Sequence, residues 1–166
     1  MKVGKAIIAG LVGGVAMTVL AWLVRLAGLQ MNAEMMLGSM VSSSPGATTW
    51  LIGFMIHLMI SALIALAYAW GFERVTHRAG AVVGLGFAVI HLMIAGMVMA
   101  MIPAMHPMIP ERMPAPGAFM ANMGGTFVAL FVIEHLMYGA IVGAMYGPVE
   151  HPAPGRAVPA ADARRA

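Results

Sequence analysis

Four long apolar segments, separated by shorter polar connections, dominate the hydropathy pattern of this chain. They cover about residues 6–29, 50–72, 79–102 and 124–146. A helix that crosses the hydrocarbon core of a bilayer needs roughly 20 apolar residues, and each segment reaches that length. The pattern therefore predicts an all-α integral membrane protein with four transmembrane helices in one domain, residues 1–147.

Composition agrees with a membrane protein. Of the 166 residues, 61% are hydrophobic and 9% are charged, and a soluble domain of this size could not bury so much apolar surface. The first segment resembles a signal peptide, but its uncharged run over residues 6–24 exceeds the usual signal core of about 7–15 residues. We expect it to be retained as a helix. Residues 148–166 contain few large apolar side chains, and we expect a disordered cytoplasmic tail there.

The basic residues lie unevenly between the two sides of the predicted bundle. Seven fall on the side of the termini and two on the other side. Because all connections are short, this excess predicts that both termini are cytoplasmic. The formal net charge of +3 then reflects topology and contact with anionic lipid headgroups, not binding of nucleic acid. The residues on the termini side are Lys2, Lys5, Arg74, Arg78, Arg156, Arg164 and Arg165, and those opposite are Arg25 and Arg112.

The second half of the chain resembles the first. A shift of 78 residues places His57 on His135 and Tyr68 on Tyr146, each His being followed by Leu-Met. A weaker shift of 70 residues relates "AGLVGG" in the first segment to "AGAVVG" in the third. These matches indicate two duplicated helical hairpins related by an axis along the membrane normal. Chance recurrence of Ala, Gly, Leu and Met in an apolar chain is the alternative.

Three histidines lie within the apolar segments, at His57, His91 and His135. Each shares a helical face with small residues, which let membrane helices approach closely, so we expect all three to face the bundle interior. His91 and His135 can meet if the third and fourth helices pack antiparallel. Glu134, the single acidic residue in a predicted span, either stays protonated or contacts a histidine or Tyr138, as a proton relay or as a structural contact.

Two cofactor hypotheses follow from these residues. A b-type haem or another tetrapyrrole could lie between the helices, with His91 and His135 as ligands and His57 as a further candidate. Alternatively, the 19 methionines include several in the outer connections, where thioethers and imidazole could bind Cu(I). Packing of irregular apolar gaps by methionine is the other interpretation. The candidate Cu(I) ligands are Met31, Met35, Met105, His106 and Met108.

Familiar catalytic patterns do not occur in the sequence. The chain has no cysteine, and its single aspartate lies in the tail. This excludes thiolate metal sites, iron–sulfur clusters and a Ser–His–Asp triad, and neither a phosphate-binding glycine loop nor an HExxH motif is present. We therefore expect a protein without enzymatic activity.

The stretches "TWLIGFMIHLMISALIALAYA", "PAPGAFMANMGG" and "EHLMYGAIVGAMYG" resemble a family of small uncharacterised bacterial four-span integral membrane proteins, a domain of unknown function. The resemblance implies a four-helix fold in the bacterial inner membrane, and it implies no activity. Our leading hypothesis is an accessory or assembly subunit that packs against other membrane-protein subunits or self-associates in the bilayer. Cu(I) handling and haem binding are the alternatives.

Overall fold

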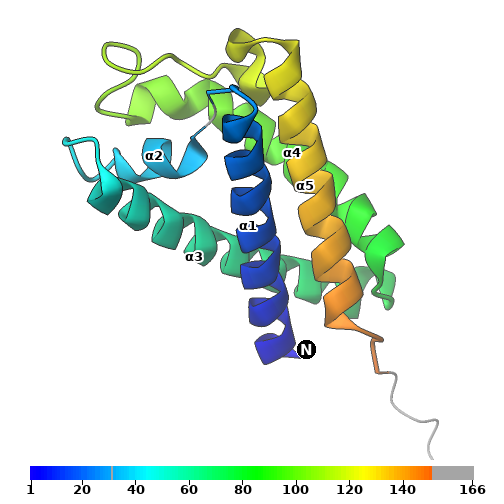
Figure 1. Ribbon diagram of the computed structural model, residues 1–166. Helices are drawn as coiled ribbons and strands as arrows, with labels where there is room; N and C mark the ends of the chain where they lie inside the picture. Colours follow the sequence, from blue (N-terminus) through cyan, green and yellow to red (C-terminus); the bar gives the residue numbers. More distant parts are fainter. Residues whose placement is uncertain (31, 151–166) are drawn as a thin grey trace, which may run out of the picture.

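Four long helices form the body of the protein, arranged as Figure 1 shows. The computed structural model describes residues 1–30 and 32–150. All four helices are long and apolar enough to cross a membrane, which confirms the predicted all-α class with four transmembrane helices. Residue Met31 and most of the tail for which we predict disorder lie outside the described residues. The helices are α1 (Val3–Leu26), α3 (Ala47–Gly71), α4 (Ala81–Met105) and α5 (Gly125–Tyr146).

Three short helical elements complete the described part of the chain. The π-helical turn η1 (Phe72–Thr76) continues α3 toward α4, and the 3₁₀-helix η2 (Ala118–Met123) precedes α5. The helix α2 (Ala33–Gly38) follows α1, and its first turn is capped by Asn32, whose Oδ1 accepts a hydrogen bond from the Met35 N–H at 2.9 Å. The hydropathy pattern does not predict α2, because six residues are too few to show a helical period.

The beginning of α1 and the end of α5 lie at the same end of the bundle. The backbone N–H of Lys2 donates to the Tyr146 hydroxyl at 2.9 Å, and this hydroxyl donates to Glu73 Oε1 at 2.6 Å. The Lys2 ammonium also lies 3.1 Å from Glu150 Oε1, and its hydrogen bond lowers the pKa of this exposed carboxyl. We call this end the termini end. The opposite end, formed by residues 27–30, 32–46 and 106–124, is the loop end.

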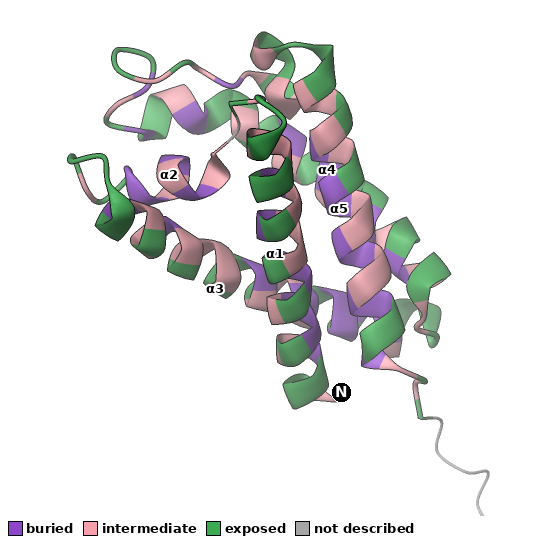
Figure 2. Cartoon of the chain, in the orientation of Figure 1, coloured by how far each residue is buried: buried purple, intermediate pink, exposed green. Residues whose placement is uncertain are grey.

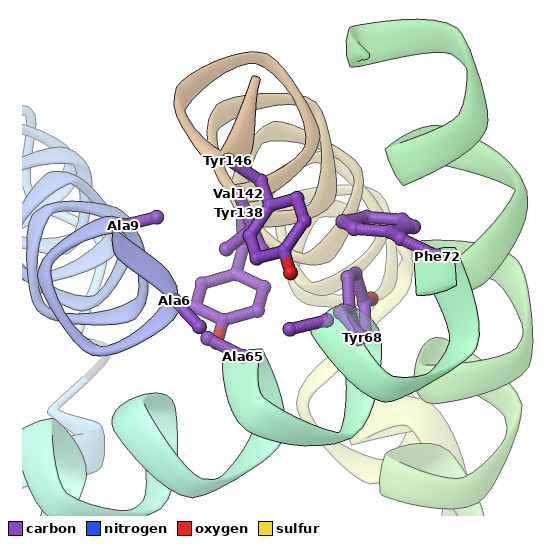
Figure 3. Packing of buried hydrophobic residues seen from close by; sticks show 9 residues of the cluster. Ala6, Ala9, Ala65, Tyr68, Phe72, Tyr138, Val142 and Tyr146 are labelled. Atoms are coloured by element: carbon purple, nitrogen blue, oxygen red, sulfur yellow. The ribbon is translucent and has the colours of Figure 1, made fainter. Parts of the chain in front are cut away.

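Helix α1 packs against both α3 and α5, and α4 packs against α5 (Figure 1). Although α3 and α4 follow each other in sequence, they touch mainly near η1 and diverge toward the loop end. An aromatic cluster holds them together there, with the Phe72 and Phe87 ring centroids 5.1 Å apart. Tyr68, Tyr138 and Tyr146 belong to the same buried core (Figure 3). The core of the bundle is thus concentrated near the termini end.

The two hairpins, α1–α3 and α4–α5, pack in the same register. Close approach of the helices occurs at equivalent positions, where a Cβ on a glycine of one helix would overlap atoms of the other. The positions correspond through the same shifts of 70 and 78 residues that align the sequences, which favours duplication over chance recurrence. The equivalent pairs are Gly10–Ala65 with Gly80–Gly143, and Gly14–Ser61 with Gly84–Gly139.

Much of the outer surface of the long helices consists of exposed residues (Figure 2), and many large apolar side chains are among them. On α4, for example, Val82 is 81% exposed and Ile90 is 60% exposed. Surfaces of this kind are unfavourable in water and are compatible with the hydrocarbon core of a bilayer. The chain is therefore a multi-pass membrane protein.

Candidate functional site

A cavity of about 470 Å³ lies between the diverging helices α3 and α4. His57 on α3 and His91 on α4 line its two walls, and His135 and Glu134 on α5 line its back. Helix α2 and parts of residues 109–123 line it toward the loop end. Beyond His91, the contact of its ring with Tyr68 closes the space toward the termini end, with ring centroids 6.1 Å apart.

The mouth of the cavity opens between apolar side chains. Ile60 on α3 and Ile94 and Val98 on α4 line the cavity, yet they are 36%, 54% and 41% exposed. These residues stand on the two helices that diverge, at a depth where the outer surface is apolar. A molecule dissolved in the lipid could therefore reach the cavity between α3 and α4 without passing through water.

All three intramembrane histidines line this cavity, as the sequence led us to expect of residues that face the interior. Each is held through its Nδ1 atom. His57 Nδ1 lies 3.3 Å from Thr18 Oγ1, and His91 Nδ1 lies 3.4 Å from the Tyr68 hydroxyl. His135 Nδ1 lies 2.7 Å from the carbonyl oxygen of Phe131. Within the described residues, none of the three Nε2 atoms has a hydrogen-bond partner.

The predicted meeting of His91 and His135 is confirmed. Their ring centroids lie 4.9 Å apart in an edge-to-face arrangement, because α4 and α5 pack antiparallel and closely at the Gly84–Gly139 pair. The short distance between the two imidazole rings argues against a haem held between them. No macrocycle can pass between rings in edge contact, so the pair cannot supply ligands to opposite faces of one haem.

Glu134 is 4% exposed, and its Oε1 has no hydrogen-bond partner among the described residues. The sequence suggested that Glu134 contacts a histidine or Tyr138, but among the described residues its carboxyl group forms no hydrogen bond to any of them. The Tyr138 hydroxyl donates instead to the carbonyl oxygen of Ser61, across the bundle. A buried carboxyl group therefore lies beside the cavity, with one oxygen enclosed and without a protein donor among the described residues.

A second buried carboxyl group, Glu34, is one that the sequence did not indicate. It is 1% exposed, because α2 folds back against α3. Its Oε2 lies 3.5 Å from Arg25 Nη1, and its Oε1 lies 4.0 Å from His57 Nδ1. The approach of α2 requires a glycine at Gly53, where a Cβ would overlap the Glu34 carbonyl oxygen. The sequence signal is weak, consisting of an arginine at a span end and a capping asparagine before the acid.

The residues suggested for Cu(I) are not brought together into one ligand set. Met35 lines the intramembrane cavity, whereas Met108 lines a separate surface hollow at the loop end. Met105 is 52% exposed, and Met31 lies outside the described residues. His106 is occupied at both nitrogens, because Nε2 donates to the Met36 carbonyl oxygen at 2.9 Å and Nδ1 accepts from the Met108 N–H at 3.1 Å. His106 thus joins α2 to the end of α4.

The described residues also contain no group of three or more His, Asp or Glu side chains placed to hold a metal ion. A bare ion would therefore have at most two imidazole ligands here, together with thioether sulfur. Binding of Cu(I) through the methionine thioethers stays a prediction. Among the described residues, the cavity itself offers three imidazoles in an otherwise largely apolar lining.

Comparison with known proteins identifies a family. Neither a curated protein nor a solved structure matches this chain. The family model that matches covers residues 1–155, which include all four long helices and every residue of the cavity. The chain belongs to DUF6789, a family of unknown function.

Proposed function

We propose that this protein is a non-enzymatic membrane protein that binds a small lipophilic molecule in the cavity between α3 and α4. The observation that carries the proposal is the cavity itself, about 470 Å³ in volume and open toward the bilayer between apolar side chains. Ligand sites are typically concave and mostly apolar, with a few polar groups that fix orientation. Here the polar groups, His91, Glu134 and His135, lie together on one side.

The unpaired polar atoms support this assignment. A polar group in hydrocarbon without a hydrogen bond costs several kcal/mol, and burial without a partner is rare in proteins. Glu134 Oε1 is enclosed without a hydrogen-bond partner among the described residues. The three imidazoles are held through Nδ1, and their Nε2 atoms have no protein partner there. A ligand with a polar or Lewis-acidic centre would bind one or more of these Nε2 atoms, which gives the cavity a reason to keep the histidines.

We also propose that the termini end faces the cytoplasm of a bacterial inner membrane. Lys2, Lys5, Arg74 and Arg78 lie at this end, and Arg25 and Arg112 lie at the other. This distribution supports the orientation through the preference of basic residues for the cytoplasmic side. The mouth of the cavity, which is lined toward the loop end, would then open in the outer half of the bilayer.

A substitution that fills the cavity tests the binding function. Ala95 lines the cavity on α4, and Ala95→Phe would place a ring in it without removing a polar group. Ala100 lies on the exposed side of the same helix, so Ala100→Phe is the matched control. We expect native mass spectrometry of protein purified from its own membranes to detect a bound small molecule in the wild type and in Ala100→Phe, and to find it missing from Ala95→Phe.

Both variants should keep the helical circular dichroism of the wild type. The proposal fails if the wild type carries no small molecule, or if Ala95→Phe retains it as well as Ala100→Phe does.

A further inference from the structure

We infer that the ligand of this cavity is a metal-containing tetrapyrrole, bound through His135 Nε2 as its single axial protein ligand. The inference rests on the proposed function, since it names the chemical class of the bound molecule. It differs from a haem held between two histidines, which the contact of the His91 and His135 rings disfavours.

The first argument is the tautomer of His135. A carbonyl oxygen only accepts hydrogen bonds, so the 2.7 Å contact with the Phe131 carbonyl requires that Nδ1 carries the proton. In a neutral imidazole the lone pair is then on Nε2, the nitrogen with no protein partner among the described residues. A histidine that donates from one nitrogen to a carbonyl and binds a metal through the other is a common arrangement in metal sites. For His57 and His91 the hydrogen-bond partners are hydroxyl groups, which do not fix the tautomer, although Glu34 Oε1 also lies 4.0 Å from His57 Nδ1.

The second argument is the orientation of the His135 ring. The Phe131 ring centroid lies 4.2 Å away and the His91 ring centroid 4.9 Å away. The side chain is 6% exposed, yet it lines the cavity. Its ring is therefore packed between aromatic neighbours and held by the hydrogen bond, so little conformational freedom would be lost when Nε2 binds a ligand.

The third argument is the number of ligands that the protein provides. The described residues contain no group of three His, Asp or Glu side chains that could bind a bare metal ion. A tetrapyrrole already provides four nitrogen ligands to its metal and needs only one axial ligand from the protein. A single prepared imidazole in a large apolar space suits such a complex and does not suit a free ion.

The fourth argument is the character of the surrounding space. About 470 Å³ is far more than a metal ion requires, and the mouth between Ile60 and Ile94 opens to the bilayer. A planar macrocycle is apolar over both faces and dissolves in membranes, so it could enter along this path. Thioether side chains adapt to the shape of an apolar neighbour and interact well with aromatic rings. Six line the cavity, namely Met35, Met36, Met99, Met113, Met120 and Met123.

The test compares a tetrapyrrole with and without its metal. The probes are zinc protoporphyrin IX, whose metal takes one axial ligand, and metal-free protoporphyrin IX, added to the full-length protein in detergent micelles. Absorption and fluorescence titrations measure the affinity of each. We expect the wild type to bind the zinc complex more tightly than the metal-free ring, with a red-shifted Soret band.

The variant His135→Leu should weaken binding of the zinc complex by about 10- to 100-fold, a loss comparable to that seen on disturbing metal-ligand shells. Its affinity for metal-free protoporphyrin IX should stay the same, which a merely structural role would not produce. His57→Leu changes another histidine that lines the cavity and can lower the affinity, but the complex that forms should keep the red-shifted Soret band, because the shift reports the axial ligand. In His135→Gly, added imidazole should restore the band, because free imidazole can occupy the space of the lost side chain.

The inference is overturned if His135→Leu binds zinc protoporphyrin IX as tightly as the wild type, if both probes bind the wild type equally, or if His57→Leu loses the band while His135→Leu keeps it. Its failure is distinguishable from failure of the proposed function. If the wild type binds neither probe but carries another small molecule that Ala95→Phe removes, the cavity is a binding site for a different class. If no small molecule is found either, both proposals fail.

Discussion

Replacement of Gly84 by alanine tests the close packing that brings α4 onto α5 and His91 onto His135. A Cβ at Gly84 would overlap the Gly139 carbonyl oxygen, which is a backbone atom and cannot rotate away. Gly86 lies two residues further along the same helix, with nothing within 4 Å of a Cβ placed there. Gly86→Ala therefore makes the same chemical change in the same helix without the contact.

The expected difference follows from two free-energy terms. Replacing glycine by alanine in a helix stabilises it by about 0.8–1 kcal/mol, and this term is common to both variants. Overpacking of a close contact costs about 1–3 kcal/mol, and it applies only to Gly84→Ala. The free energy of unfolding of the two variants should therefore differ by about 1–3 kcal/mol, with Gly86→Ala the more stable protein.

The assay is equilibrium unfolding in mixed micelles with an increasing fraction of a denaturing detergent, followed by far-ultraviolet circular dichroism. Gly14→Ala gives an intermediate case, because the Cβ would meet the Ser61 side chain, which can change rotamer. Its loss of stability should be smaller than that of Gly84→Ala. Equal stability of Gly84→Ala and Gly86→Ala would refute the packing of α4 on α5 described above.

Three further predictions concern other parts of the molecule. Arg25→Leu should lower the free energy of unfolding by about 3–5 kcal/mol, since it leaves buried Glu34 without its ion-pair partner. The double variant Arg25→Leu with Glu34→Leu should recover part of this loss. A double variant that is less stable than Arg25→Leu alone would argue against the pairing. Because the chain has no cysteine, single-cysteine variants report which side of the membrane a residue is on. A membrane-impermeant maleimide should label Ser43→Cys in intact cells and Thr76→Cys only after permeabilisation. The reverse labelling pattern would invert the proposed orientation. If the accessory-subunit hypothesis is correct, the tagged protein should copurify with other membrane proteins in a fixed ratio after mild detergent extraction, whereas isolation as a lone chain would speak against it.

The hydropathy pattern was sufficient to predict the four long helices, because length and apolarity alone determine which segments can cross a bilayer. Helical spacing and the direct connection between α4 and α5 were also enough to predict that His91 meets His135 if the two helices pack antiparallel. The two sequence shifts anticipated the shared register of the hairpins, in which Gly84 faces Gly139. These features depend on local periodicity and chain connectivity, and both can be read along the chain.

The cavity and its polar contacts could not be predicted in the same way. Helices α3 and α4 are joined by a short turn and would be expected to pack along their length, yet they diverge. Glu34 is buried only because α2 returns against α3 at Gly53. The hydrogen bond between His106 and the Met36 carbonyl oxygen joins residues 70 positions apart in sequence. Such contacts depend on how distant elements are packed together, which local patterns do not specify.

The central claim is that a lipophilic molecule occupies the space between α3 and α4 and contacts His135. An experimental structure of the protein, purified from its own membranes and crystallised in a lipidic mesophase, tests this claim most directly. We predict density for a bound molecule within the cavity, with its metal or polar centre adjacent to His135 Nε2. A structure in which α3 closes against α4, or in which the His135 ring is turned away from an otherwise empty cavity, would contradict it.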